Sequence, residues 1–142
     1  MEVNAILSDS VVVADGKLFV QGGGWNVLNT PRLPTRHPRI GLGLVISVPF
    51  TETDRDHAFA VRLEDADGQP VGKAGSDGHQ GRANGTFRVG RSPHLADGDE
   101  ELVALALNFD GLTFTQAGRY RFVLSIDGES ERNLPFTVRA TS

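Results

Sequence analysis

The sequence has no cysteine among its 142 residues. Disulfide bonds, thiolate metal sites and a cysteine nucleophile are therefore excluded. It also has no apolar run approaching the roughly 20 residues that cross a bilayer, and Met1 is followed by Glu2 rather than by the basic and apolar blocks of a signal peptide. These absences predict a cytoplasmic protein that does not contact a membrane.

Lysine is almost absent as well, since twelve of the fourteen basic residues are arginine and the net charge is −4. Affinity for nucleic acid comes mainly from Lys and Arg side chains that neutralise phosphates. The one basic cluster is PRLPTRHPR, residues 31–39. We therefore expect that nucleic acid is not a partner.

Alternation of apolar with small or polar residues runs through most of the chain. In RIGLGLVISVPF, for example, Ile40, Leu42 and Leu44 share one face of an extended strand. This pattern is typical of antiparallel strands that bury one face. Strands are predicted at 2–13, 17–28, 40–50, 57–65, 69–73, 84–90, 101–109, 118–127 and 131–139.

Residues 101–109 could also form a helix, because Asp99 could cap it and Ala and Leu favour helices. A strand is preferred, since strand patterns flank the segment and Asp110-Gly111 resembles a hairpin turn at its end.

Six Asp-Gly pairs and Asn84-Gly85 supply turn signals throughout. Residues 73–99 contain the least apolar stretch, and 75–83 is predicted to be a loop outside the core. The chain is thus predicted to be a single all-β domain, residues 1–142, with seven to nine strands in a two-sheet antiparallel sandwich.

Two resemblances support this prediction. The stretch LTFTQAGRYRFVLSIDG is similar to the late part of an immunoglobulin-like sandwich, with Ala117, Gly118 and Tyr120 matching its tyrosine corner. The cysteine pair of that fold is missing, and Trp25 lies too early for its core tryptophan. The chain as a whole resembles an uncharacterised family of short bacterial all-β proteins. The matching stretches are NAILSDSVVVADGKLFVQGGGWN, HPRIGLGLVI, VRLEDADGQPV and LNFDGLTFTQAGRYRFVLSIDGE. That resemblance implies an architecture and no activity.

Three consecutive glycines, Gly22 to Gly24, precede the only tryptophan, Trp25. Glycines inside a strand mark a bend or a bulge. The alternative is a backbone cradle for an anion, but such a cradle normally precedes a helix, and none is predicted here. We therefore expect a structural bend.

The segment after Trp25 combines three prolines with basic residues, and it is interpreted as a stiff connection between strands. It could also form a rim for an acidic partner, because arginine forks bind carboxylates. The candidate partner-binding residues, which could form one surface, are Trp25, Arg32, Arg36, His37 and Arg39.

No pattern predicts catalysis, a metal or a cofactor. The four histidines show no paired ligand spacing, DADG at 65–68 lacks the later ligands of a calcium loop, and no serine lies in a nucleophile elbow. The function predicted is a non-catalytic module that binds a protein partner or forms a homo-oligomer. The first alternative is a small-ligand-binding sandwich that uses the Gly22–Arg39 region. The second is an enzyme whose site is assembled from loops.

Overall fold

The computed structural model describes residues 1–71 and 81–141, and in these residues the fold is all-β. The strands are β1 (Glu2–Ser8), β2 (Ser10–Ala14), β3 (Lys17–Gln21), β4 (Val27–Thr30), β5 (Thr35–Pro49), β6 (Asp56–Asp65), β7 (Arg82–Arg88), β8 (Glu100–Phe114), β9 (Gly118–Ile126) and β10 (Glu129–Ala140), with a short 3-10 turn at Phe50–Glu52. The alternation of apolar residues thus gives strands, as predicted. Within these ranges no helix is long and apolar enough to span a membrane.

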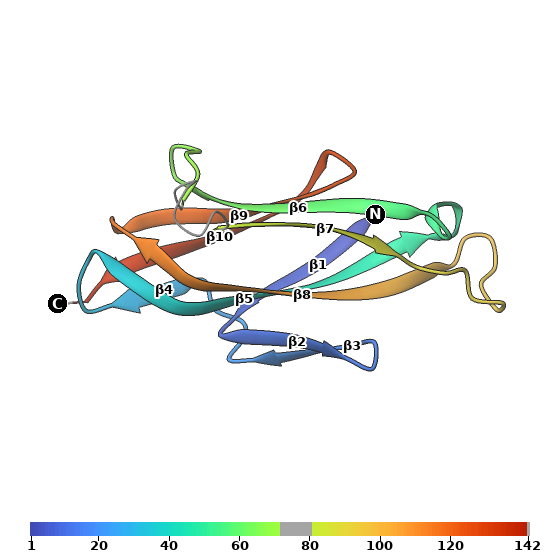
Figure 1. Ribbon diagram of the computed structural model, residues 1–142, viewed down its shortest axis with the longest axis horizontal. Helices are drawn as coiled ribbons and strands as arrows, with labels where there is room; N and C mark the ends of the chain where they lie inside the picture. The colour runs from blue at the N-terminus through green and yellow to red at the C-terminus, as the bar shows by residue number, and fades with distance from the viewer. Residues whose placement is uncertain (72–80, 142) are drawn as a thin grey trace.

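The strands form three sheets. A five-stranded sheet has the order β4-β10-β9-β6-β7, a three-stranded sheet has the order β1-β5-β8, and β2 and β3 form a separate hairpin. The two larger sheets face each other, and the hairpin lies on the outer side of the three-stranded sheet (Figure 1). One pairing departs from the predicted antiparallel pattern, because β4 runs parallel to β10.

The core lies between the two larger sheets. Alternate residues of β5, including Ile40, Leu42 and Leu44, are fully buried against aromatic side chains of the opposite sheet. Phe122 and Phe136 stack there with ring centroids 5.7 Å apart. At about 25 cal/mol per Å² of apolar surface removed from water, this enclosed cluster supplies most of the favourable free energy of folding.

The glycine run is a bend, as predicted. Gly22 and Gly24 have φ angles of 61° and 91°, which side chains rarely adopt. β3 ends before them at Gln21, and β4 begins only at Val27. The Gly24 amide donates to the carbonyl of Leu7 at 2.9 Å, so the bend fastens the chain beside β1. The two long N-terminal strands that were predicted, 2–13 and 17–28, are each divided in two.

Two predicted turns lie inside strands instead. Asp110-Gly111 does not end β8, which continues to Phe114. Gly111 has a φ of 68° and lies opposite Pro38, between the Arg39–Asp110 and His37–Leu112 pairs, and the register of the two strands is the same on both sides. Pro38 has no N–H to give to the ladder, so this one position is left unpaired.

Asn84-Gly85 lies within β7 because Gly85 packs beneath the Phe59 ring, where a Cβ would come within 2.8 Å. Part of the predicted loop is also ordered strand. Gly81 is buried and accepts a hydrogen bond from the Leu63 amide at 2.7 Å, and β7 begins at Arg82. The first residues of that loop, 75–80, lie outside the described residues. Of the predicted strand 69–73, the described residues 69–71 form an isolated bridge between Glu64 and Pro70, and 72–73 lie outside the described residues.

The tyrosine corner forms as predicted. Tyr120 is buried, and its hydroxyl donates to the Gln116 carbonyl at 2.6 Å. Its ring stacks on Phe136 and meets the edge of Phe114. The corner therefore ties the turn before β9 to the centre of the core.

Candidate interaction surface

Trp25 lies in the connection between β3 and β4 and is half-buried. Its ring meets that of Phe136 edge-on, with centroids 6.2 Å apart, and it packs against the core. Its indole Nε1 is buried and has no hydrogen-bond partner within the described part of the chain. Trp25 therefore contributes packing on the five-stranded sheet, and the ligand-binding alternative for Gly22–Arg39 stays a prediction.

The structure gathers three of the four predicted basic residues, Arg36, His37 and Arg39, at the start of β5, and Arg32 lies in the connection just before it. Arg39 donates to both carboxylate oxygens of Asp110 on β8, at 2.6 and 3.1 Å. This pairing raises the pKa of Arg39 and lowers the pKa of Asp110. Partial burial lowers the pKa of His37, so the ring is neutral at pH 7.

Arg36 lies over Gly111 so closely that a Cβ on the glycine would come within 2.5 Å of its guanidinium. No ion pair to Arg36 or Arg32 is present among the described residues. We call this end of the β5–β8 ribbon the arginine end (Arg32, Arg36, Arg39). It carries the uncompensated positive charge of Arg32 and Arg36, while Arg39 is paired with Asp110.

The opposite end of the same ribbon is acidic. Pro49 at the end of β5 pairs with Glu100 at the start of β8, and Asp97, Asp99 and Glu101 lie beside it in sequence. We call these four carboxylates the acidic end. Glu100 accepts the Ser47 hydroxyl and Glu101 accepts the Ser92 amide, and neither forms an ion pair in the described ranges.

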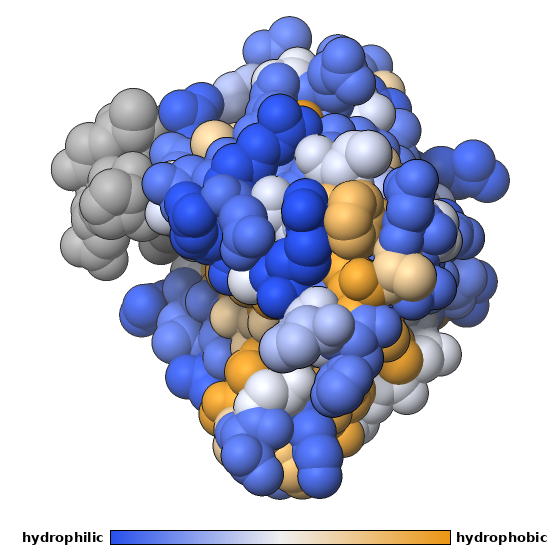
Figure 2. Space-filling view, turned by 90° about the vertical axis from the view of Figure 1, so that its right-hand side faces the viewer, coloured by the Kyte–Doolittle hydropathy of each residue, from blue (hydrophilic) through white to orange (hydrophobic). Residues whose placement is uncertain are grey.

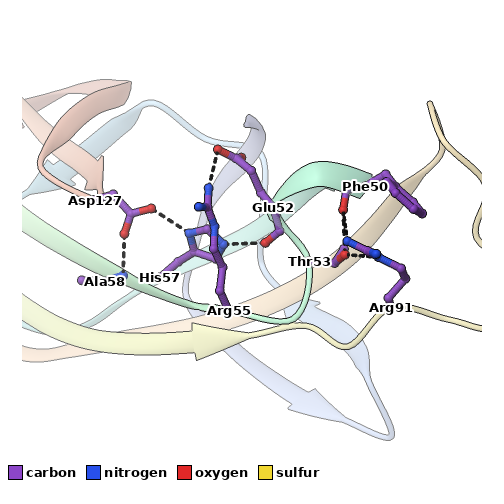
Figure 3. Close-up of polar contacts among 8 residues, drawn as sticks. All are labelled: Phe50, Glu52, Thr53, Arg55, His57, Ala58, Arg91 and Asp127. Atoms are coloured by element: carbon purple, nitrogen blue, oxygen red, sulfur yellow. Dashed lines mark hydrogen bonds and ion pairs between the residues drawn. The ribbon is translucent and has the colours of Figure 1, made fainter.

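Arg91 precedes Ser92, whose amide bonds Glu101, but it does not pair with these carboxylates. Its guanidinium is engaged by the Phe50 carbonyl at 2.9 Å, by the Thr53 hydroxyl at 2.8 Å and by the Phe50 ring. Figure 3 shows it turned toward the Phe50–Thr53 turn. The acidic end therefore keeps a net negative charge.

β8 joins the two charged ends and is the end strand of its sheet. It is 15 residues long and pairs only with β5 among the described strands. Residues 102–107, LVALAL, form an uncharged apolar run at its centre, and Leu102 is 66% exposed. An end strand presents alternate backbone N–H and C=O groups to its surroundings. β8 therefore offers a long, apolar and unpaired edge.

The β2–β3 hairpin adds a second apolar feature. The Asn108 side chain bonds both the amide and the carbonyl of Val11, at 3.0 and 2.9 Å, and holds the hairpin against β8. Gly43 leaves room for Leu18, because a Cβ there would come within 3.0 Å of that side chain. Five large hydrophobic residues are exposed in the described ranges, and four of them lie on this hairpin: Val12, Val13, Phe19 and Val20. Figure 2 shows apolar surface gathered in the lower half of one end view, where the three-stranded sheet and the hairpin lie.

His57, near the start of β6, is the one buried histidine of the described residues, and its ring stacks on Phe87. Figure 3 shows its polar contacts. Nδ1 lies 2.7 Å from a carboxylate oxygen of Asp127, and Nε2 lies 2.8 Å from the carbonyl of Glu52. Because a carbonyl only accepts, Nε2 carries a proton, and the carboxylate favours a second proton on Nδ1. Burial by itself lowers the pKa of His57, but the bonds to Asp127 and Glu52 outweigh it and raise that pKa overall.

Glu64, the buried carboxylate of the described residues, is also fully engaged. Its carboxylate accepts from Arg62 at 2.5 Å and from Arg121 at 3.0 Å, and these bonds lower its pKa. Across residues 1–71 and 81–141, no group of three or more acidic or histidine side chains is placed to hold a metal ion. His57 and Glu64 are thus both bonded to groups of the fold itself.

Sequence reasoning found the arginine end and missed the edge of β8. The uncharged run at 102–107 was visible as a strand, but its place at the end of a sheet depends on which strands pair, which one sequence does not state. His57 gave no signal either, because its partner Asp127 is seventy residues away.

A similar backbone is found in the solved structure of a Pseudomonas fluorescens alkylpurine DNA glycosylase, AlkC, bound to DNA containing an abasic site analog. The TM-score is 0.41 and the identity 16%, and the match covers 81% of this chain but only 28% of that enzyme. The expectation that nucleic acid is not a partner is corrected by this finding, because the match is to a protein bound to DNA. The likeness is too low to argue that this chain binds DNA.

No curated protein matches the chain. A family model does match, over residues 4–139, and its description is a family of unknown function, DUF6941. The resemblance to an uncharacterised all-β family is therefore confirmed, while a bacterial origin stays a prediction. Since the match covers nearly the whole sequence, the chain belongs to the DUF6941 family of unknown function.

Proposed function

We propose that the chain is a non-catalytic β-sandwich module that binds protein by taking up an extended strand along the edge of β8. The observation that carries this proposal is the 15-residue end strand with an uncharged centre. Proteins usually blunt such edges with charges, prolines or short strands, because an open edge is a template for another strand. Backbone hydrogen bonds to an added strand supply affinity, and alternate side chains supply specificity.

The non-catalytic part of the proposal is supported by the use of the ionisable groups. His57 commits both ring nitrogens to Asp127 and Glu52, and Glu64 is held by two arginines. None of these groups is left to act as a base or nucleophile on a bound substrate.

The immunoglobulin-like form of the sandwich is supported by the tyrosine corner, in which Tyr120 bonds the Gln116 carbonyl. The parallel pairing of β4 with β10 is compatible with an edge strand that changes sheets. A cytoplasmic location stays a prediction of the cysteine-free sequence.

The test is a pair of matched baits in cells that produce the protein. Ala104→Pro removes one backbone N–H from the edge of β8. Ala104→Ser is the matched control, because it also makes a small change to the side chain but keeps that N–H. Proteins recovered with the wild type and the serine variant but lost with the proline variant would support strand addition. Recovery of the same proteins with the proline variant would contradict it.

A further inference from the structure

We infer that the strand added to β8 is the β8 of a second copy, in antiparallel orientation, so that two three-stranded sheets join into one continuous sheet of a symmetric dimer. This inference rests on the proposed function of the β8 edge and names its occupant. Its evidence is the direction of the free backbone groups, the self-complementary side chains and the charge of the two ends.

Backbone groups that face away from β5 can be located from the register. The Leu7 carbonyl bonds Gly24, which lies on the far side of β1 from β5. Along an antiparallel strand, the backbone N–H and C=O groups of successive residues point to opposite sides. The backbone groups of Ile6 and Ser8 therefore point toward β5. Those of their partners on β5, Gly43 and Gly41, point back toward β1. The register then directs the backbone groups of Leu42 toward β8.

The same alternation continues into β8. Leu105 and Leu107 pair with Leu44 and Leu42 and face β5. The groups of Leu102, Ala104 and Ala106 therefore face outward, away from the sheet. These three alternate residues leave a row of backbone N–H and C=O groups without partners in β5. An identical antiparallel strand can form hydrogen bonds with all of them.

The side chains on this stretch suit a copy of themselves. Leu102, Ala104 and Ala106 share the outer face, and the two alanines are small enough for close approach of a second strand. Val103, Leu105 and Leu107 share the inner face and are only partly buried against the core. An antiparallel pairing centred in 102–107 sets apolar residues opposite apolar residues on both faces, which stabilises cross-strand pairs.

The charges favour the antiparallel orientation. The acidic end stands at the start of β8. The arginine end belongs to β5 and the connection before it, and it lies level with the finish of β8, where Asp110 already pairs with Arg39. In an antiparallel pair each acidic end lies on the same side as Arg32 and Arg36 of the other copy, whereas a parallel pair would place like charges together. Neither Arg36 nor Glu101 forms an ion pair within the described residues, so the opposite charges of the two ends attract each other across the dimer.

The experiment measures the oligomeric state of the purified full chain by sedimentation equilibrium across the micromolar range. We expect a monomer–dimer equilibrium for the wild type and for the Ala104→Ser control. Ala104→Pro removes two symmetry-related hydrogen bonds, which should weaken the dimer by roughly tenfold. The proline should be tolerated in the fold because Ala104 faces outward on an end strand.

A charge exchange tests the orientation. Arg36→Glu and Glu101→Arg should each weaken the dimer by about twofold or less, because exposed charges that do not touch interact weakly in water, and the double variant should recover most of the loss. Leu102→Lys is a second edge variant, which places a charge opposite the apolar residues of the other copy at an exposed position and keeps every backbone group. If the proline variant fails to fold, Leu102→Lys still tests whether the edge of β8 forms the dimer.

The outcomes separate this inference from the proposed function. A wild-type chain that stays monomeric overturns the dimer, and if proline-sensitive partners are still recovered from cells, the proposed function stands. A dimer that neither Ala104→Pro nor Leu102→Lys weakens overturns both for this edge. A dimer weakened by these variants but strengthened by single charge reversals overturns the antiparallel orientation.

Discussion

The two facing sheets end in strands of opposite character, β7 and β8. β7 is seven residues long, carries Arg82 and Arg88 at its ends and has Asn84-Gly85 at its centre. β8 is 15 residues long and has no charge between Glu101 and Asn108. Short, charged edges resist strand addition and long, uncharged edges invite it. The same fold therefore protects one edge and leaves the other open.

The difference has a local cause in packing. Gly85 in β7 lies beneath the Phe59 ring, so this strand gives up a side chain to bring its backbone close to β6. Arg88 at its end reaches Asp56, with a nitrogen–oxygen distance of 3.6 Å. β8 instead keeps its alternating leucines and valine in contact with the core and presents alanines outward. The open edge is thus a property of β8 itself and not of the enclosed core.

The largest expected effect on stability comes from comparing a substitution in the core with one at the edge of β8. Phe122 is fully buried and packs against Phe109 and Phe136. Phe122→Ala should lower the free energy of unfolding by about 3–5 kcal/mol, because it leaves a cavity between the sheets. Leu102→Ala, at the exposed edge, should change it by less than about 0.5 kcal/mol. Urea denaturation of both variants measures this, and equal losses would show that the edge of β8 is part of the core.

A second test uses the pH dependence of the pair formed by His57, near the start of β6, and Asp127. Hydrogen bonding to Asp127 and Glu52 raises the pKa of His57 despite its burial, so its stabilising effect is complete below its ordinary pKa of 6.5 and is lost as the pH rises through the raised value. The bond from His57 lowers the pKa of Asp127, so that contribution is present above its ordinary value of 3.8 and is lost as the pH falls through the lowered value. The pair should stabilise the fold most between the two.

Asp127→Asn is the variant that isolates this pair. Asp127 has a φ of 51°, a conformation that asparagine tolerates, so the turn should survive while the charge is removed. We expect the wild type to lose stability from pH 5 to pH 9 more steeply than the variant. Parallel profiles from chemical denaturation would show that His57 and Asp127 do not titrate as a coupled pair.

The third test concerns the tyrosine corner. Tyr120→Phe removes the bond to the Gln116 carbonyl and keeps the ring contacts with Phe114 and Phe136. The expected loss is about 0.5–1.5 kcal/mol, the net value of one hydrogen bond. The denaturation midpoint measures it, with self-association unchanged because the corner lies away from the central edge of β8. An unaltered midpoint would mean that water replaces the bond without cost.

The sequence was sufficient for the strands, because period-two alternation reports burial of one face directly. It was also sufficient for the bend at Gly22–Gly24, which depends on local backbone geometry, while the bond of Tyr120 was implied by the resemblance to an immunoglobulin-like corner. It misplaced Asp110-Gly111 and Asn84-Gly85, because the same dipeptides occur in turns, opposite a proline and at sites of close packing, and only the neighbouring strand decides which. For the candidate surface it named Arg36 and Arg39 without the edge that joins them to the acidic end, since pairing order is a long-range property.

The smallest expected effect on stability gives the most direct test of the two edges. Leu102→Lys adds to β8 the kind of charge that β7 carries, and Arg88→Ala removes one from β7; both side chains are exposed. Each should change the free energy of unfolding by less than about 0.5 kcal/mol. Light scattering at matched concentrations should nevertheless show less association for Leu102→Lys, and for Arg88→Ala no change or a slight increase. If both variants associate like the wild type, charge on these two strands does not control association. Any remaining self-association would then use another part of the surface, such as the face of the hairpin that carries Val12 and Phe19.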